Sequence, residues 1–409
     1  MKKKQMPEKY RSAMAVAGCC MGTFWSGAIA FGYPGIMSTV WQEQFGVGSS
    51  ETGLVVTIML LAISVCTIFS GRYLNRFGIR ACVLTGTVLM AAGMLLLMGA
   101  ESIYMVYAWA FVENLGASFV YGPGLTTAQQ WVPARRGLVS GLVNLTFGLS
   151  AAIMTPVWEY MLENTGYEAV NLHLLLCIVV TNCIVLLLVR SPEGAVQKKD
   201  GKQTAAQPAF TGLTPLQALK TRKFRLLWLT WAFVGAAGIS MVSFSKSYAL
   251  QAGVSSVVVM MAFNLTNGGG RLLAGILCDV IGGELAGLLA FVIATVACFL
   301  LPHVHSLAGI AILAACVGYG FGSLFAVTSP IAAEQFGLRH FGSIFGLIFT
   351  GYGCLGGLIG PALCGVLLER SGGNYTAVFT LLAVFLLLGT VCMALFRRAP
   401  DAQPQDPLT

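Results

Sequence analysis

Twelve apolar stretches, each close to the length of a bilayer-spanning helix, limit what this sequence can fold into. A spanning helix needs about 20 consecutive apolar residues. Only 10% of the 409 residues are charged, against roughly 25% in soluble domains, which excludes a soluble enzyme and a disordered chain. We therefore expect an all-α membrane protein with twelve transmembrane helices. The stretches cover residues 12–40, 51–72, 79–100, 102–125, 137–158, 169–189, 224–248, 254–278, 285–302, 306–330, 342–368 and 375–396.

A single long polar segment divides the twelve stretches into six and six. It covers residues 191–223, and its Thr214-Pro215 pair is typical of a helix start, which predicts a short amphipathic helix in this cytoplasmic linker. We expect two pseudo-symmetric six-helix bundles joined by the linker and followed by a cytoplasmic tail, at residues 1–190, 224–398 and 399–409.

Lysine and arginine residues gather on one side of the predicted membrane. Twenty-one of the 24 lie in the two termini, in the linker, or in the loops after the second, fourth and tenth stretches, whereas Lys246 and Arg370 lie on the other side. The positive-inside rule then places both termini and the linker in the cytoplasm. We expect a multi-pass protein of a bacterial inner (cytoplasmic) membrane, surrounded by the lipid bilayer. The net charge of +8 reflects this topology and indicates no nucleic-acid partner, because the basic residues flank helix ends.

The twelve cysteines show no metal-binding or redox pattern. They fall in or at the ends of apolar stretches, no CxxC motif occurs, and no histidine lies at ligand spacing from a cysteine pair. The apolar stretches also contain no Ser/His pair, HExxH motif or paired carboxylates. We therefore expect no metal site, no cofactor and no enzyme.

A glycine-rich segment recurs at the same place in each half of the chain. Residues 71–80 follow the second stretch and residues 275–283 follow the eighth, so that their starts are 204 residues apart. Short glycine-rich turns also recur by chance between helices. Their common position favours a duplicated six-helix unit, which is typical of transporters that bind their substrate between the two halves.

Segment 71–80 resembles the signature loop of the major facilitator superfamily. Three further segments resemble one branch of it, the monocarboxylate transporters and the bacterial oxalate/formate antiporter relatives: residues 131–138, 214–221 and 267–271. The resemblance implies two bundles that rock around a central substrate, with a conformational role for Arg76 and, in the second repeat, for Asp279. Asn75 stands where the family's loop usually has Asp, which removes a charge thought to help hold the two halves together.

Arg271 is one of two ionisable residues well inside the predicted spans. An arginine held in the apolar zone is costly and usually faces a cavity or a partner. One interpretation is that it snorkels to the cytoplasmic interface or pairs with Glu334 or Asp279. The other is that it binds an anionic substrate, because guanidinium holds a carboxylate bidentately and stays charged. The resemblance favours the second interpretation, since the family's substrate-binding arginine matches this position.

Two asparagines precede Arg271 at helical spacing. Asn267 lies one turn before it, so both side chains project from the same face, and Asn264 is a further candidate on that face. In proton-linked animal relatives the position of Asn267 often holds an Asp. Because Asn cannot titrate, we expect Asn267 to bind the substrate or to orient Arg271, and the proton carrier to lie elsewhere or to be absent.

Glu113, the second ionisable residue inside the spans, lies in the middle of the fourth stretch. A carboxyl group in the apolar zone is costly when charged, which suits a residue that takes up and releases a proton. The alternative is a neutral structural glutamate, hydrogen-bonded to Asn114 or to a neighbouring helix. The resemblance supplies no matching residue for it.

Aromatic residues complete the predicted substrate site. The resemblance implies that Tyr121 in the fourth span binds the carboxylate, and that Phe321 and Phe325 in the tenth span box in the anion. Tyr33 is a further candidate, although a single aromatic residue in a membrane helix more often packs or faces lipid. The oxalate branch also carries a lysine for a second carboxylate, and Tyr352 stands at that place.

One buried cation favours a substrate with one carboxylate, because a second one would stay desolvated and unpaired. The glycines of the eleventh stretch, Gly360 among them, make that span closely packed and bendable, as a rocking interface needs. We therefore expect a monomeric alternating-access transporter that moves a small monocarboxylate such as lactate, pyruvate or formate by proton symport. A carboxylate anion exchanger, an amphipathic drug/proton antiporter and a transporter-like membrane sensor are the alternatives.

Overall fold

The computed structural model describes residues 7–192 and 212–400, and the fold is built from helices. The described part contains one isolated β-bridge, between Gly212 and Gly337, and no extended β-strand. Residues 193–211 of the predicted linker and residues 401–409 of the predicted tail lie outside the described residues. The fold is all-α, as the apolar stretches predict.

The N-terminal half contains five α-helices that supply six spans. The first two helices together form the first span, and the fourth helix is one span. α3 and α5 are each two spans that meet at a glycine. Gly78 has φ 79° and Gly166 has φ 84°, a backbone conformation that glycine adopts without the cost that a Cβ brings. The elements are α1 (Glu8–Phe31), α2 (Tyr33–Phe45), α3 (Ser49–Met98), α4 (Ile103–Trp131), a 3₁₀ turn η1 (Pro133–Arg135) and α5 (Arg136–Leu188).

The C-terminal half supplies the other six spans. α6 is a short helix at the end of the linker, where Thr214 Oγ1 accepts a hydrogen bond of 3.3 Å from Gln217 N and Pro215 occupies the first turn. The eleventh predicted stretch is interrupted by a π-helical turn, η3. The elements are α6 (Pro215–Lys220), α7 (Arg222–Gln251), α8 (Ser256–Ile281), α9 (Gly283–Leu300), η2 (Leu301–His303), α10 (Leu307–Phe336), α11 (Phe341–Thr350), η3 (Gly351–Gly356), α12 (Gly357–Arg370) and α13 (Tyr375–Arg398).

Nine helical stretches of the described residues are long and apolar enough to cross a membrane. The two that contain α3 and α5 bend at a glycine and supply two spans each. α8 is not among the nine and is the twelfth span; it carries Asn264, Asn267 and Arg271. The first span is longer than predicted and breaks at Gly32, where α1 passes into α2.

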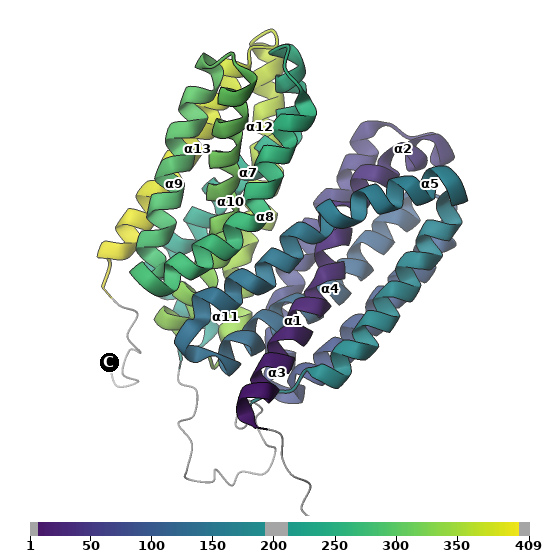
Figure 1. The fold of residues 1–409 in the computed structure, drawn as a ribbon, viewed down its shortest axis with the longest axis vertical. Coiled ribbons are helices and arrows are strands. Elements are labelled where there is room, and N and C mark those ends of the chain that lie inside the picture. Colours follow the sequence, from purple (N-terminus) through teal and green to yellow (C-terminus); the bar gives the residue numbers. More distant parts are fainter. Residues whose placement is uncertain (1–6, 193–211, 401–409) are drawn as a thin grey trace, which may run out of the picture.

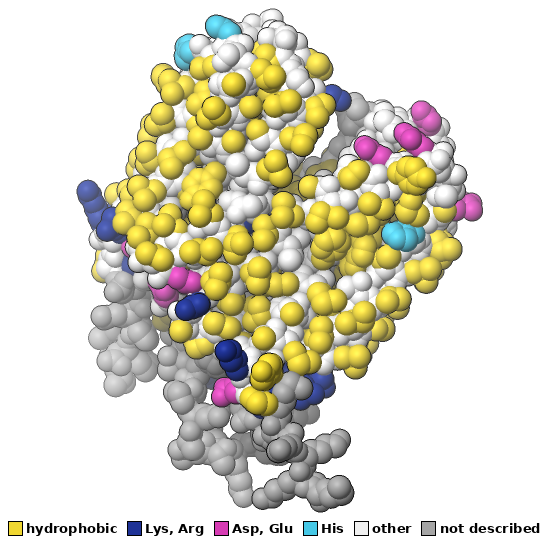
Figure 2. All heavy atoms as spheres, viewed as in Figure 1, with side chains coloured by type: hydrophobic (Ala, Val, Ile, Leu, Met, Phe, Trp, Pro, Cys, Tyr) yellow, Lys and Arg dark blue, Asp and Glu magenta, His cyan; other side chains and the backbone are white. Residues whose placement is uncertain are grey.

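The two halves form separate bundles that touch at one end of the molecule and separate toward the other (Figure 1). We call the touching end, where α1 begins and α13 ends, the basic end, because Lys and Arg side chains gather there (Figure 2). At the opposite end the surface is hollowed between the halves, and acidic side chains lie on the N-terminal half (Figure 2). Apolar side chains cover the flanks, as a surface in contact with lipid requires.

Glycine contacts close the basic end. Gly137 in α5 lies against Gly275 in α8, and Gly71 in α3 lies against Gly342 in α11. In both pairs the backbones approach so closely that a Cβ on either residue would overlap the partner. Gly71 and Gly275 are the first residues of the two repeated segments, so the internal repeat builds the contacts that join the halves.

Candidate functional site

Arg271 lies within α8 at the boundary between the two halves. Its side chain is 1% exposed. Nε donates to the carbonyl oxygen of Asn267 (3.2 Å), and Nη2 donates to Oδ1 of the same residue (3.3 Å). Nη1 donates to the carbonyl oxygen of Asn144 in α5 (3.3 Å). The guanidinium is therefore held by one residue from each half.

No described carboxylate neutralises Arg271. Its hydrogen-bond partners are a side-chain amide and two backbone carbonyls, all of them uncharged. Glu334 is exposed on α10, and Asp279 binds the backbone of α5. The burial of Arg271 also excludes snorkelling in this conformation. A cation without a counter-ion in the interior is costly, so this position can attract an anion.

Tyr121 reaches the site through Asn144. The Tyr121 hydroxyl donates to Oδ1 of Asn144 (2.9 Å). Nδ2 of Asn144 donates to the carbonyl oxygens of Ser140 (2.9 Å) and Phe325 (3.3 Å). Asn144 thus links α4, α5, α10 and Arg271. We did not single it out from the sequence; the signal that could have found it is a lone amide in an apolar stretch, because a buried amide needs partners.

Aromatic rings enclose the guanidinium on the side of the C-terminal half. Cζ of Arg271 lies 4.3 Å from the ring centroid of Phe325, within cation–π range. The ring of Phe321 packs edge-on against Phe325, with centroids 5.5 Å apart. Gly238 of α7 faces Phe321 so closely that any side chain there would displace the ring. Both predicted phenylalanines therefore lie at the site, Phe325 against the cation and Phe321 behind it.

Tyr352 lies in the π-helical turn η3 and faces the same ring cluster. Its ring centroid is 5.5 Å from those of Phe325 and Phe349 and 6.0 Å from that of Trp231. Its hydroxyl is buried and has no hydrogen-bond partner among the described residues. Gly235 makes room for the ring, since a Cβ there would lie 2.7 Å from Cδ2 of Tyr352. Trp231 and Phe349 were not among the residues that we singled out from the sequence.

The two asparagines of α8 lie on the face of Arg271. Asn267 is half-buried and binds the guanidinium through both its backbone and its side chain. Asn264 lies a further turn away and is exposed. Asn267 is therefore part of the site in this conformation, whereas Asn264 lies at its edge.

Tyr33 and Glu113 lie away from this site, inside the N-terminal half. α1 breaks at Gly32, and the Tyr33 hydroxyl then donates to Oδ1 of Asn171 in α5. The structure does not place Tyr33 with the predicted substrate-binding residues. Glu113 lies eight residues before Tyr121 in α4, or about 12 Å along the helix axis.

Asp279 and Asn75 join the halves at the basic end in different ways. The Asp279 carboxylate accepts hydrogen bonds of 2.8 Å from the N–H groups of Gly137 and Leu138. These groups lie at the N-terminus of α5, where the helix dipole favours an anion. At the matching place in the first repeat, Nδ2 of Asn75 donates to the carbonyl oxygen of Arg339 (2.7 Å). The hydrogen bonds that join the halves therefore involve a charged side chain in the second repeat and a neutral one in the first.

Gly360 and Arg76 make contacts within their own halves. A Cβ on Gly360 would lie 2.6 Å from the carbonyl oxygen of Ala236, so this glycine packs α12 against α7. Cζ of Arg76 lies 5.1 Å from the ring of the next residue. Other glycines of this span face the other half: besides Gly342, they include Gly353, where a Cβ would lie 2.6 Å from the carbonyl oxygen of Leu60. Gly353, rather than Gly360, is therefore placed at the interface.

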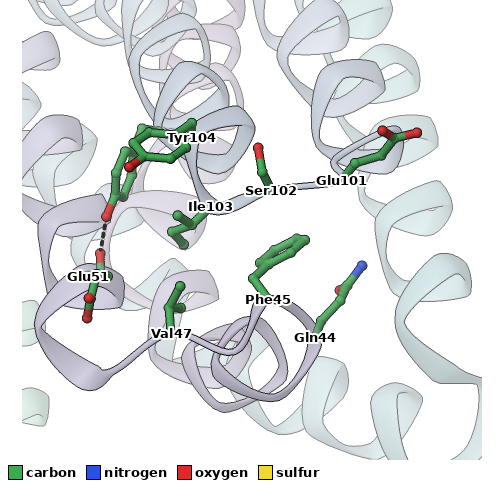
Figure 3. A pocket seen from close by; sticks show the side chains of 9 residues that line it. Gln44, Phe45, Val47, Glu51, Glu101, Ser102, Ile103 and Tyr104 are labelled. Atoms are coloured by element: carbon green, nitrogen blue, oxygen red, sulfur yellow. Dashed lines mark hydrogen bonds between the residues drawn. The ribbon is translucent and has the colours of Figure 1, made fainter.

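A surface pocket of about 410 Å³ lies at the opposite end of the N-terminal half (Figure 3). The end of α2, the start of α3 and the start of α4 form it, and Tyr107 donates to the carbonyl oxygen of Glu51 (3.0 Å) at one wall. Glu51 and Glu101 make its lining acidic, which disfavours an anion. None of the predicted site residues lines this pocket.

The sequence matches a known family along its length. The family model of the Major Facilitator Superfamily matches residues 15–361 and 285–409. The oxalate:formate antiporter of Oxalobacter formigenes is 25% identical over 77% of this chain and 75% of its own length. Monocarboxylate transporter 2 of Meriones unguiculatus is 26% identical over 85% of this chain and 78% of its own length. Monocarboxylate transporter 13 of Bos taurus is 26% identical over 95% and 92%.

The fold also matches solved structures. FucP, a Major Facilitator Superfamily transporter in the outward conformation, superimposes with a TM-score of 0.74 over 94% of this chain and 99% of its own, at 15% identity. The human organic anion transporter MFSD10 superimposes with a TM-score of 0.73 over 95% and 100%, at 14% identity. These relatives and structural neighbours are transporters and not enzymes. The chain belongs to the Major Facilitator Superfamily and is a secondary transporter.

Proposed function

We propose that this transporter carries a small monocarboxylate such as lactate, pyruvate or formate, and that Arg271 binds its carboxylate. The observation that supports the proposal is the buried guanidinium whose described partners are all neutral. An anionic cargo would offset part of the cost of burying that cation, and guanidinium matches a carboxylate bidentately. Relatives named for formate, oxalate and monocarboxylates agree with this cargo class.

The other groups around Arg271 favour one carboxylate over two. Phe321 and Phe325 are apolar, and the Tyr352 hydroxyl is neutral. A second carboxylate would remain desolvated without a cation, at a cost of several kcal/mol. The unpartnered Tyr352 hydroxyl can instead bind a carboxylate oxygen or the hydroxyl or oxo oxygen of a lactate- or pyruvate-like substrate. Asn267 orients the guanidinium, and Tyr121 orients Asn144, which contacts the guanidinium.

The distribution of charge supports the orientation in the membrane. With the basic end in the cytoplasm of a bacterial cell, both termini are cytoplasmic, and the hollow between the halves opens outward. The contacts at Gly71 and Gly275 then close the cytoplasmic side. Transport by a monomer follows when the halves rock around the bound anion, so that the glycine contacts separate and the outer ends meet.

The negative interior of a cell opposes the entry of an anion. Entry becomes favourable when a proton enters with the anion or when another anion leaves. We propose proton symport with Glu113 as the proton-carrying residue, because Asn267 beside Arg271 cannot titrate. In each cycle the anion binds to the buried cation Arg271 and the proton binds to the buried acid Glu113. The loaded transporter therefore moves no net charge across the membrane. Anion exchange is the second candidate, because the relative from Oxalobacter formigenes is named as an antiporter.

Uptake by proteoliposomes tests the cargo and the role of Arg271. Radiolabelled lactate and pyruvate are offered to vesicles that contain the wild type, Arg271→Ala, Arg271→Lys or the exposed control Arg370→Ala. We expect uptake to be lost in Arg271→Ala, to be strongly reduced in Arg271→Lys because a point charge cannot bind bidentately, and to persist in the control. Undiminished uptake by Arg271→Ala would overturn the proposal.

Preloaded vesicles separate symport from exchange. A proton symporter accumulates lactate in empty vesicles when the outside is acidic. An exchanger needs formate or another carboxylate inside and responds little to the pH gradient. Uptake that occurs only into preloaded vesicles would replace symport by exchange and leave the role of Arg271 unchanged.

A further inference from the structure

The interior of the N-terminal half holds a second polar cluster, apart from Arg271. Its centre is Glu113, which is 1% exposed and whose two carboxyl oxygens have no hydrogen-bond partner among the described residues. The adjacent Asn114 does not serve it, since its Nδ2 donates to the carbonyl oxygen of Ala110 (3.0 Å). No described cation pairs with Glu113. A carboxylate charge here would have no counter-ion, so the position suits a carboxyl that holds a proton.

The elements packed around Glu113 present neutral groups to it. α3 presents Gly93, and a Cβ there would lie 3.1 Å from Oε2 of Glu113, so the missing side chain leaves room for the carboxyl. α2 presents Tyr33, whose ring packs against that of Trp109, one helical turn before Glu113 in α4. α5 presents Asn171, the acceptor of the Tyr33 hydroxyl. The titratable groups on this side are tyrosines: Tyr33 and, beyond it, Tyr167.

Indole rings surround Tyr33. The ring centroids of Trp41, Trp109 and Trp158 lie 6.2, 5.5 and 5.6 Å from that of Tyr33. The indole nitrogens of Trp109 and Trp158 and Nδ2 of Asn171 are buried and have no partner among the described residues. A buried water makes about three hydrogen bonds to such groups, so unpartnered donors near an acid have the capacity to hold water.

A line of polar groups leads from Tyr33, near Glu113, toward the opposite end of the molecule. Tyr33 donates to Oδ1 of Asn171, and Asn171 lies one helical turn after Tyr167 in α5. The Tyr167 hydroxyl accepts a hydrogen bond of 3.4 Å from Nε1 of Trp41. Tyr167 directly follows the glycine at which α5 bends, and it is half-buried. The line therefore ends near the outer surface of the N-terminal half.

We propose that Glu113 is a protonation site with its own route to the solvent at the opposite end. The route is water held along Tyr33, Asn171 and Tyr167, inside the N-terminal half, because an amide side chain cannot itself pass a proton on, and it does not run past Arg271. The proton leaves the Glu113 carboxyl, which becomes a carboxylate, and water at the surface receives it. The inference rests on the proposed function only in taking this proton as the one that accompanies the anion.

Hydrogen–deuterium exchange followed by infrared spectroscopy tests the route. The full-length protein in lipid vesicles, without substrate, is transferred from H₂O to D₂O, and the carboxylic C=O band is recorded with time. We expect a band that is lost in Glu113→Gln and retained in the exposed control Glu101→Gln. Its deuterium shift should be slower in Tyr33→Phe and Tyr167→Phe than in the wild type. In Tyr121→Phe, which alters the central site, the rate should stay the same.

Two results would overturn the proposal. One is a C=O band that Glu113→Gln leaves intact. The other is slower exchange in Tyr121→Phe combined with unchanged exchange in Tyr33→Phe, which would place the route past Arg271. If Glu113→Gln does not fold, Gly93→Ala replaces it, because crowding of Oε2 must shift the band; an unshifted band then contradicts the assignment. Since no substrate is added, failure here leaves the monocarboxylate proposal standing, and failure of lactate uptake leaves this one standing.

Discussion

A Cβ atom on Gly148 of α5 would lie 2.9 Å from Nε and 3.0 Å from Cζ of Arg271 of α8. The guanidinium therefore occupies space that a side chain of the opposite half would fill. The carboxyl of Glu113 lies against Gly93 in a similar way. Because the interior of a protein is closely packed, a buried charged group of this size needs volume that a neighbouring helix gives up. Both ionisable residues within the spans obtain it from a glycine.

Gly148→Ala should weaken substrate binding without removing any polar group. The added methyl group would crowd the guanidinium, and overpacking of this kind costs about 1–3 kcal/mol. We expect the KM for lactate uptake to rise roughly tenfold, since 1.4 kcal/mol is a factor of ten. Gly269→Ala, in the same helix as Arg271 but with no atom within 4 Å of the added Cβ, is the control. Equal KM values in the two variants would contradict the prediction.

Asp279→Asn should loosen the basic end more than Asn75→Ala does. A carboxylate at a helix N-terminus contributes about 1–2 kcal/mol through its hydrogen bonds and the dipole. The neutral hydrogen bond of Asn75 contributes about 1 kcal/mol. We expect Asp279→Asn to populate longer distances between spin labels placed on either side of the basic end in a cysteine-free background. A larger shift in Asn75→Ala would show that the first repeat, and not the second, makes the stronger contact between the halves.

The spans and part of the site could be predicted from regular features of the sequence. Twelve apolar stretches predict the spans because each is long enough to satisfy its own backbone hydrogen bonds. Arg271 and Asn267 could be placed on one face because a four-residue spacing is a local helical property. The short helix at the end of the linker follows from Thr214-Pro215, whose capping depends on neighbouring residues alone. These features need no knowledge of how the helices pack.

The remaining features of the site depend on how helices meet. Asn144 connects Tyr121 to Arg271 only because α4, α5 and α8 pack together, which no local pattern reveals. Trp231 and Phe349 join the ring cluster through packing between α7 and α11. Tyr33 turns inward because the first span breaks at a glycine, whereas a continuous helix was predicted. Side-chain direction after a break is set by tertiary contacts.

Tyr352 should control whether the site accepts one carboxylate or two. Tyr352→Phe removes only the unpartnered hydroxyl, so we expect lactate uptake to fall by a factor of about two to ten, the value of one neutral hydrogen bond. Tyr352→Lys adds a second buried cation and should let oxalate compete with lactate, at reduced lactate affinity because of charge repulsion with Arg271. Competition assays with both anions measure this. An unchanged preference in Tyr352→Lys would place the residue outside the substrate site.

His340 should make closure of the basic end sensitive to acid. Burial, Arg339 and Arg72 lower the pKa of His340 below its ordinary value, so the closed structure favours the neutral ring. The ring contributes its full stability above the ordinary histidine pKa of about 6.5, and this contribution is lost as the pH falls toward the lowered value. We expect the thermal unfolding midpoint to drop with pH in this range, and His340→Gln to reduce the drop. An identical pH dependence in the variant would exclude His340 as its source.

Glu113→Gln should separate proton coupling from substrate binding. Glutamine resembles the protonated carboxyl in shape and charge but cannot release a proton, so the variant should still exchange labelled for unlabelled lactate across the membrane. Acceleration of net uptake by an acidic exterior should disappear, because no proton can be delivered and returned in each cycle. Glu101→Gln, an exposed acid at the opposite end, should keep the wild-type response. Vesicles with imposed pH gradients measure both activities, and a gradient response that survives in Glu113→Gln would assign the proton to another residue.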